Sequence, residues 1–265
     1  MVVDYDNDLI LVTCASGKQA PYLLRHLQPK WKRLRLTAHS DTSVQRLKEQ
    51  YPKAEVVKAD MNNAADASRS LSGVTAIWHV GPSLHPHESE VGYTMIDAAV
   101  VESRRQGSNF QHFVYSSVLQ TQLRKLMNHN AKRYVEEYLM EPGLNFTILQ
   151  PSHFVDGFFS IIYEDHGEAA AKVFEEREKH YFAQYPLVST YPTNYKSVVE
   201  AASRALGKEI RIERISFEHA LERLLLYYNR RGLLGNPNVT EWLLGRRPTT
   251  LEDFIERAVK TQGLG

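Results

Sequence analysis

The chain has 265 residues, a formal net charge of +1 at pH 7 and 43% hydrophobic residues, which suits one large α/β domain or a domain with a small second lobe. The near-neutral charge gives no electrostatic basis for binding nucleic acid or an acidic membrane surface, and no apolar run approaches the ~18 residues of a membrane span. A single cysteine excludes an internal disulfide framework, and the short acidic N-terminus does not resemble a signal peptide, so we expect a cytoplasmic protein.

Apolar strand patterns alternate with amphipathic helical patterns through the first part of the chain. The predicted strands are Leu9–Thr13, Arg33–His39, Ala54–Asp60, Thr75–Gly81, His112–Ser117 and Asn145–Ser152. Helices are predicted after Gly17, with Pro21 in the first turn, and over Ser43–Tyr51, Asn62–Ser72, Val91–Gln106 and Asn130–Glu141. The alternation predicts parallel crossovers and an α/β fold with a Rossmann-type doubly wound sheet.

Beyond about Ser160 the pattern becomes mainly helical. Helices are predicted over Glu168–Glu178, Asn194–Lys208, Phe217–Leu234 and Arg247–Val259, and strands over Tyr181–Thr190 and Glu209–Ile215. We therefore predict a dinucleotide-binding domain over residues 1–157 and a smaller, mostly helical substrate lobe over residues 158–265, interleaved with the sheet.

Several short motifs fall at the predicted strand ends and on the helices. They are Ala15–Gln19 (ASGKQ), Val57–Asp60 (VKAD), Phe113–Ser117 (FVYSS), the helix carrying Lys132, Thr147–Pro151 (TILQP) and Arg247–Phe254 (RPTTLEDF). As a set they resemble the NmrA-like group of atypical short-chain dehydrogenases. The resemblance implies a Rossmann NAD(P)-binding domain with a small substrate lobe. Members of the group include reductases of small molecules and regulators that bind a dinucleotide without turning it over.

The chain departs from the family pattern in three places. The usual Gly-x-x-Gly-x-x-Gly turn has Cys14, Gly17 and Ala20 at its three positions. The tyrosine that lies four residues before the lysine in working reductases is replaced by Asn128. The segment between Phe159 and Glu168 is also shorter than the resemblance implies, which predicts a compact cap.

The first turn is predicted to hold the dinucleotide pyrophosphate. Backbone N–H groups at a helix N-terminus bind phosphate through unpaired donors and the helix dipole, so the chemistry does not depend on particular side chains. The residues assigned to this role are Thr13, Cys14, Ser16, Gly17, Lys18 and Gln19. Cys14 is interpreted as a small buried side chain, with a reactive thiol or a blocked cofactor site as the alternatives.

The next two strand ends are predicted to bind the adenosine half. His39 and Ser40 can hydrogen-bond a 2′-phosphate, with Lys18 and Arg46 adding charge, which favours NADP; Asp41 facing inward would favour NAD. The resemblance implies that Asp60 and Met61 flank the adenine, and Asp60 can equally cap the following helix.

The loop from His79 to Glu88 contains three histidines and a glutamate. We predict that Gly81 and Pro82 line the nicotinamide-ribose side of the cleft and that His85 is a proton donor. A metal site is the alternative, but the spacing of His85, His87 and Glu88 is not that of a helical zinc motif, so no metal is expected.

The resemblance assigns the catalytic roles. Ser116 would orient the substrate carbonyl and Lys132 would hold the nicotinamide ribose, although Lys132 on a solvated helix face is the alternative. Asn128 cannot supply a proton, so His153 is a second candidate acid beside His85, with a hydrogen-bonded structural histidine in the turn as the alternative. Pro151 would lie against the nicotinamide.

These residues favour an NAD(P)H-dependent reductase of a small organic molecule, with NADP as the cofactor and NAD as the alternative. Three other hypotheses stay open: a regulatory protein that binds dinucleotide and a protein partner, an isomerase or cyclase on the same fold, and a degenerate relative without cofactor. A small-molecule substrate is expected, and neither nucleic acid nor membrane is an expected partner.

Overall fold

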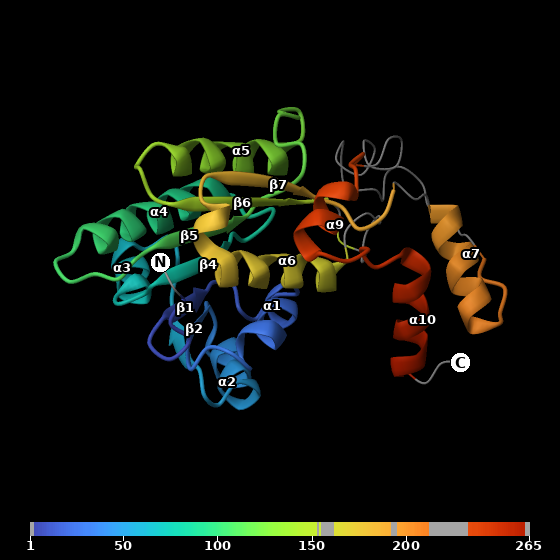
Figure 1. The fold of residues 1–265 in the computed structure, drawn as a ribbon, viewed down its shortest axis with the longest axis horizontal. Helices are drawn as coiled ribbons and strands as arrows, with labels where there is room; N and C mark the ends of the chain where they lie inside the picture. The colour runs from blue at the N-terminus through green and yellow to red at the C-terminus, as the bar shows by residue number, and fades with distance from the viewer. Residues whose placement is uncertain (1–2, 153, 155–161, 192–194, 212–232, 263–265) are drawn as a thin grey trace. The chain divides into compact units, whose positions relative to one another are not determined.

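The computed structural model describes residues 3–152, 154, 162–191, 195–211 and 233–262, and a seven-stranded sheet lies at its centre (Figure 1). The strands are β1 (Leu9–Val12), β2 (Arg33–Ala38), β3 (Glu55–Lys58), β4 (Ala76–Val80), β5 (His112–Ser116), β6 (Phe146–Pro151) and β7 (Ala183–Leu187). The helices are α1 (Ala20–Leu27), α2 (Asp41–Gln50), α3 (Ala64–Leu71), α4 (Glu88–Arg104), α5 (Met127–Met140), α6 (Tyr163–Glu176), the short η1 (Arg177–His180), α7 (Tyr195–Leu206), α9 (Asn238–Leu244) and α10 (Leu251–Gln262).

Strand β1 lies inside the sheet, between β2 and β4, where the strand order reverses. The order is β3-β2-β1-β4-β5-β6-β7, and every neighbouring pair from β3 to β6 is parallel. Ile10 of β1 pairs with Leu34 of β2 on one side and with Ala76 of β4 on the other. This is the doubly wound Rossmann order that the sequence predicted, and ligands bind such sheets at the carboxyl ends of the strands beside the reversal.

Helices cover both faces of the sheet, as a parallel sheet requires (Figure 1). On one face α3, α4 and α5 pack over a buried apolar cluster that includes Leu11, Ile77 and Phe113. On the other face α6 meets α1 at Gly167, where a Cβ would lie 2.5 Å from the carbonyl carbon of Tyr22. Only glycine allows α6 to approach the backbone of α1 this closely.

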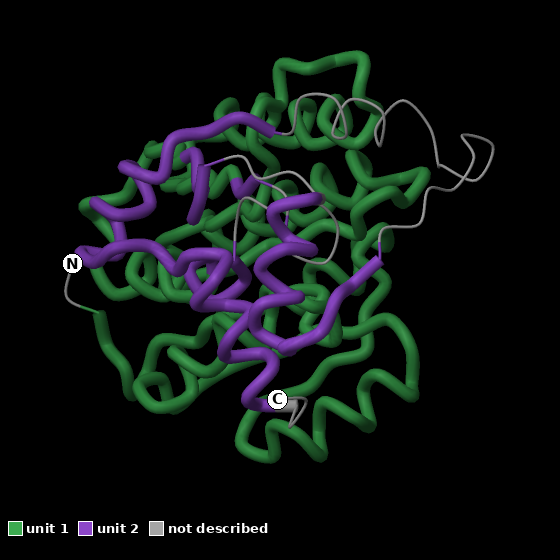
Figure 2. Tube along the Cα trace, turned by 90° about the vertical axis from the view of Figure 1, so that its right-hand side faces the viewer, with its two compact units in different colours: residues 1–150, 167–185 green, residues 151–166, 186–265 purple. Residues whose placement is uncertain are grey.

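The chain divides into two compact units (Figure 2). Unit 1 is formed by residues 1–150 and 167–185, and unit 2 by residues 151–166 and 186–265. Unit 1 contains most of the sheet. In unit 2 the fully buried carboxylate of Asp165 accepts hydrogen bonds from Arg246 at 2.8 Å and from the Thr249 backbone N–H at 2.8 Å. These bonds fix the segment that leads into α10.

The six strands predicted in the first part of the chain are confirmed, with ends that differ by one or two residues. A capping box opens α10, because Asp253 N donates to Thr250 Oγ1 at 3.1 Å and Thr250 N donates to Asp253 Oδ2 at 3.4 Å. Helix α6 begins at Tyr163, five residues earlier than predicted, and α9 is a helix that the sequence analysis missed. The part of the predicted Glu209–Ile215 strand that the structure describes, residues 209–211, is not a strand, and the helix predicted over Phe217–Leu234 lies almost entirely outside the described residues.

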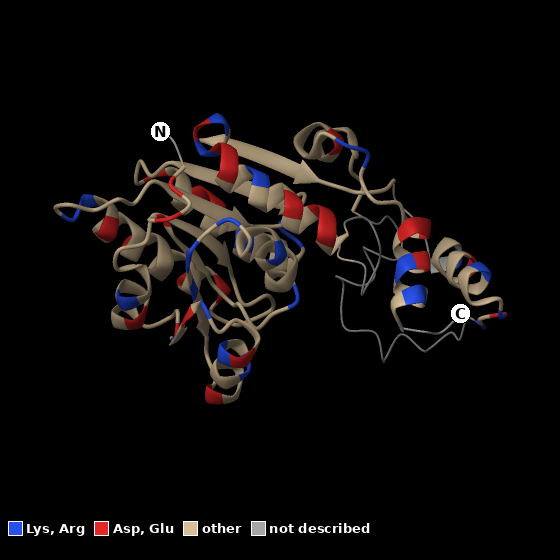
Figure 3. Cartoon of the chain, turned by 60° about the horizontal axis from the view of Figure 1, so that its bottom comes forward, with Lys and Arg blue, Asp and Glu red and all other residues tan. Residues whose placement is uncertain are grey.

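Acidic and basic residues are mixed along the same helices, for example on α6 and α10 (Figure 3). Lys30 pairs with Glu175 at 2.6 Å within unit 1, and Arg257 pairs with Glu164 at 2.6 Å within unit 2. Among the described helices, none combines the length and the apolar character needed to cross a bilayer.

Candidate functional site

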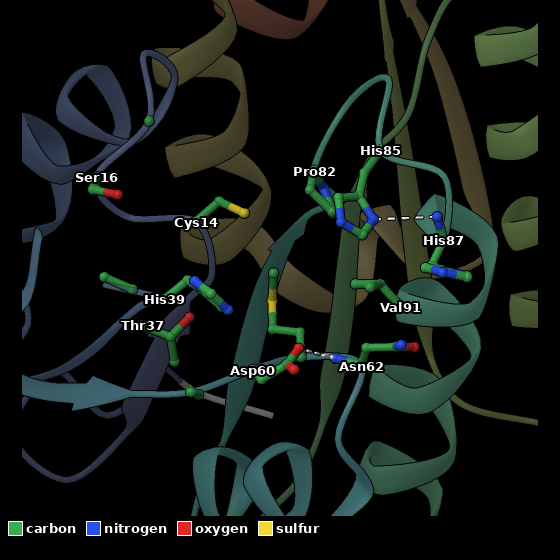
Figure 4. A pocket seen from close by; sticks show the side chains of 14 residues that line it. Cys14, Ser16, Thr37, His39, Asp60, Asn62, Pro82, His85, His87 and Val91 are labelled. Carbon is green, nitrogen blue, oxygen red and sulfur yellow. Dashed lines mark hydrogen bonds between the residues drawn. The ribbon is translucent and has the colours of Figure 1, made fainter. Parts of the chain in front are cut away.

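A cavity of about 570 Å³ lies at the carboxyl ends of β1, β2, β3 and β4 in unit 1 (Figure 4). Its volume is within the range of small-molecule and cofactor sites. The cavity is lined by Cys14, Ser16, Gly17, Thr37, Ala38, His39, Ala59, Asp60, Met61, Asn62, Pro82, His85, His87 and Val91. It therefore lies where the doubly wound order predicts a ligand.

The loop after β1 forms one wall of the cavity. Cys14 has a φ of +46°, a left-handed conformation in the position where the family usually has glycine. The loop is closed by Gly17 N–H donating to Cys14 O at 2.8 Å and fixed to β2 by Ala15 N–H donating to Thr37 O at 3.0 Å. Arg46 of α2 donates to Ser16 O at 3.1 Å, which places a cation beside the loop. Burial raises the pKa of the Cys14 thiol to about 11, so the thiol is not activated.

The start of α1 fits an anionic group. Gln19 is the N-cap and makes no side-chain capping bond to the first turn, and Pro21 lies in that turn. A Cβ on Gly17 would lie 3.1 Å from Cys14 O, so glycine keeps the loop narrow. The helix N-terminus and the bare Gly17 backbone are the features that pyrophosphate binding requires. Lys18 is exposed on the same loop.

Thr13 holds the loop to β4 with its side chain and does not line the cavity. Its buried hydroxyl accepts from Val80 N–H at 2.8 Å and lies 3.3 Å from His79 Nδ1. His79 stacks on Tyr115 with ring centroids 5.7 Å apart, and burial lowers its pKa to about 3. His79 is therefore neutral and sits within the core behind the cavity.

The ends of β2 and β3 form the side predicted for the adenosine half. His39, Asp60 and Met61 line the cavity, whereas Ser40 is the N-cap of α2 and accepts from Ser43 N–H at 3.2 Å. Asp60 accepts from Asn62 N–H at 3.0 Å. The side-chain cap of α3 is Asn63 rather than Asp60.

A second hollow, of about 680 Å³, shares His39 and Asp60 with the cavity. Ser40, Asp41, Lys58 and Arg69 are among the other residues that line it. Lys58 Nζ lies 2.7 Å from Asp41 Oδ2. Arg69 pairs with Asp66 at the same distance. Both cations beside the β2 end therefore have carboxylate partners.

The loop after β4 forms the opposite wall of the cavity (Figure 4). Pro82, His85 and His87 line the cavity, and Gly81 lies between β4 and this wall. His85 Nδ1 accepts from His87 N–H at 3.2 Å, the bond that Figure 4 shows between the two residues. In the described part of the chain, no cluster of three or more His, Cys, Asp or Glu side chains is arranged to hold a metal ion.

Lys132 is buried against Glu88, the first residue of α4. The Lys132 ammonium lies 2.7 Å from Glu88 Oε1, and the side chains are only 7% and 2% exposed. The ammonium also lies 5.8 Å from the centre of the Tyr115 ring. Asn128, in the position of the family tyrosine, is half-buried on the same helix.

The two serines at the end of β5 have different partners. Ser116 donates to Gln19 Oε1 at 2.8 Å, and Ser117 donates to the buried Glu136 carboxylate at 2.5 Å. Glu136 also accepts from Thr121 and Gln150, both at 2.9 Å. Burial raises the pKa of Glu136. Ser116 thus ties β5 to Gln19 at the start of α1, and Glu136 is a buried acid that sequence analysis did not single out.

The structure brings eight of the predicted residues to the cavity: Cys14, Ser16, Gly17, His39, Asp60, Met61, Pro82 and His85. Sequence analysis did not assign Thr37, Ala38, Ala59, Asn62, His87 or Val91 to the site, although five of the six lie at strand ends or in the loops that follow. Pro151 is buried at the end of β6 and belongs to unit 2. His153 lies outside the described residues.

The model of the NmrA-like family matches residues 6–163. Among curated proteins, the sequence search finds no match.

Solved structures similar to the chain include both enzymes and a regulator. The triphenylmethane reductase of Citrobacter sp., complexed with NADP(H), is 18% identical with a TM-score of 0.79, covering 94% of this chain and 99% of that one. The NADPH-dependent quinone oxidoreductase of Escherichia coli, complexed with NADPH, is 18% identical with a TM-score of 0.77 and the same coverage. NmrA, a negative transcriptional regulator, in complex with NAD, is 16% identical with a TM-score of 0.76 and covers 97% of each chain.

Proposed function

Because the chain belongs to the NmrA-like family, we propose that it binds a nicotinamide dinucleotide in the cavity beside Gly17 and reduces a small organic molecule. NADP is the proposed cofactor and NAD the alternative, since similar structures hold NADP(H), NADPH and NAD. The observation that carries the proposal is the cavity itself, which extends from Cys14, Ser16 and Gly17 in the loop before α1 to the ends of β2, β3 and β4.

The dinucleotide supplies a hydride when it is bound, so the chain has to position the ligand and supply a proton. The backbone around Gly17 would hold the pyrophosphate, and His39 would lie at the ribose of the adenosine half. His85 on the opposite wall is the proposed proton donor, because its imidazole lines the cavity and carries an N–H group. The assignment of residues 158–265 to the substrate side is part of the same proposal.

Binding is tested by calorimetry and thermal unfolding with NADPH, NADP, NADH and NAD. A ligand at a hundred times its dissociation constant should stabilise the protein by about 2.7 kcal/mol. Adenosine, which lacks the pyrophosphate, is the control ligand and should give a much smaller shift. The absence of stabilisation by all four dinucleotides would refute the proposed binding.

Reduction is tested by the loss of NADPH absorbance with a panel of quinones and triarylmethane dyes, the substrate classes named for the similar enzymes. Replacing His85 with asparagine should lower kcat by about a hundredfold, the usual contribution of a general acid. His87→Asn is the matched control, since His87 lines the same wall and should retain most of the activity. Equal losses in both variants would refute the role of His85.

A dinucleotide-binding regulator is the second candidate, and two contacts and one residue replacement favour it. Lys132 is paired with Glu88, the Ser116 hydroxyl donates to Gln19, and Asn128 replaces the tyrosine. This candidate predicts tight dinucleotide binding, no oxidation of NADPH with any substrate, and a protein partner whose capture depends on the dinucleotide. Steady turnover would exclude it.

A further inference from the structure

The buried pair of Glu88 and Lys132 connects α5 to the loop that forms one wall of the cavity. The two carboxylate oxygens of Glu88 have different partners: Oε1 lies 2.7 Å from Lys132 Nζ, and Oε2 accepts from Leu84 N–H at 3.1 Å. Gly81 packs over the same side chain, since a Cβ on Gly81 would lie 3.7 Å from Glu88 Cγ. Glu88 therefore contacts the loop at two points and α5 at a third.

The loop needs such an anchor because its backbone is tightly folded. His85 N–H donates to Pro82 O and Glu88 N–H donates to His85 O, each at 3.1 Å. Leu84 has a φ of +63°, a conformation that residues other than glycine rarely adopt. Since the Leu84 side chain is 72% exposed, packing of that side chain does not hold the conformation, and the Glu88 carboxylate bonded to its N–H does.

We propose that Glu88 is a positioning residue of the dinucleotide site and that Lys132 acts on this site through Glu88. The inference rests on the proposed dinucleotide binding. In this assignment Lys132 neutralises Glu88, and Glu88 fixes the loop so that Pro82 and His85 stay at the cavity wall. A Lys132 that instead held the ribose would share its ammonium between the ribose and Glu88, whose Oε1 it contacts at 2.7 Å.

A double-mutant cycle separates the two roles. The variants are Glu88→Gln, Lys132→Met and the double variant that combines them. The double variant has no unpaired buried charge, so it keeps the comparison possible if a single variant folds poorly. Each single variant should weaken NADPH binding by about tenfold, a typical coupling between contacting residues, and the double variant should be no weaker than the worse single variant. Lys132→Arg keeps the ion pair and should retain most of the affinity.

Hydrogen exchange of the ligand-free protein is a second measurement, because local exchange in one loop distinguishes a loosened loop from a loss of overall stability. Glu88→Gln and Lys132→Met should raise deuterium uptake in residues 81–87 and leave the loop around Gly17 unchanged. The matched control is Arg177→Met, which breaks a pair with Asp8 that is also buried, at 2.9 Å, but near the start of β1 rather than at the cavity. It should lower the melting temperature without altering NADPH affinity or exchange in residues 81–87.

The outcomes are distinct. If Lys132→Met weakens binding while Glu88→Gln does not, Lys132 contacts the cofactor directly and the inference is overturned. If exchange in residues 81–87 is unchanged in both single variants, the anchoring role of Glu88 is likewise overturned. If the wild type binds none of the dinucleotides, the proposed function fails, and the exchange experiment still decides whether Glu88 anchors the loop.

Discussion

Gly92 of α4 lies directly against Val135 of α5: a Cβ on Gly92 would lie 2.4 Å from Val135 Cγ2. Real Cβ atoms do not approach other atoms this closely, so the absence of a side chain sets the distance between the two helices. Both helices cover the buried face of the sheet behind the cavity, and Lys132 and Glu88 lie on them. The contact therefore has a consequence for stability that can be measured.

Gly92→Ala should lower the free energy of unfolding by about 1–3 kcal/mol, because overpacking outweighs the higher helix propensity of alanine. Urea unfolding at pH 7 measures the change. Val135→Ala removes the two methyl groups that would clash with the new Cβ. The double variant Gly92→Ala/Val135→Ala should therefore lose less free energy of unfolding than the sum of the losses in the two single variants. Additive losses would show that the α4–α5 contact does not limit the approach of the helices.

Cys14→Gly should raise the affinity for the dinucleotide by about three- to tenfold, since glycine adopts the left-handed conformation of residue 14 without strain and leaves more room for the pyrophosphate. Calorimetry with NADPH measures the affinity. Cys14→Ala is the control, because it removes the sulfur but keeps the Cβ, and it should change the affinity little. A similar gain in both variants would assign the effect to the sulfur rather than to the backbone.

Asp41→Asn should shift cofactor preference toward NADP. The pair of Asp41 and Lys58 is exposed, so its loss costs little, and the released ammonium can bind a 2′-phosphate at the end of β2. We expect the ratio of NADP to NAD affinity to rise about fivefold, the size of one exposed charge contact. Glu49→Gln, an exposed change on the same helix and outside both hollows, should leave the ratio unchanged.

His79→Phe should reduce the loss of stability in acid. The folded protein keeps His79 neutral, with a pKa of about 3, whereas the unfolded chain takes up a proton below about pH 6.5. Stability therefore falls as the pH drops from 6.5 toward 3, by about 1.4 kcal/mol per pH unit for each such histidine. Urea unfolding measured between pH 7 and pH 4.5 gives the slope of the unfolding free energy against pH. This slope should be smaller in His79→Phe than in the wild type by that amount. An unchanged slope would contradict the neutral state of His79.

The fold was predictable because its signals are local. Each strand of the sheet is a short apolar run, and its turn residues lie next to it in sequence, as with Val12 and the loop to Gly17. The carboxyl ends of parallel strands share one edge, so the position of His39, Asp60 and Pro82 around one cavity followed from the order of the elements.

The parts of the site that sequence analysis did not predict depend on long-range contacts. Thr13 was assigned to the cofactor, yet its hydroxyl is bonded to Val80 of the neighbouring strand β4. Lys132 meets Glu88 only after α4 and α5 have packed together. The left-handed backbone of Cys14 and Leu84 could not be predicted either, because neither residue type favours it.

Unit 1 is not continuous along the chain, since residues 151–166 belong to unit 2 and residues 167–185 return to complete unit 1. During synthesis the first 150 residues therefore emerge with the outer side of β6 unpaired, and β7 covers that side only after residue 187 has left the ribosome. Until then the exposed strand edge is a site for pairing with a second chain. Once it has formed, β7 covers that edge, and a chain truncated after β6 would leave the edge exposed.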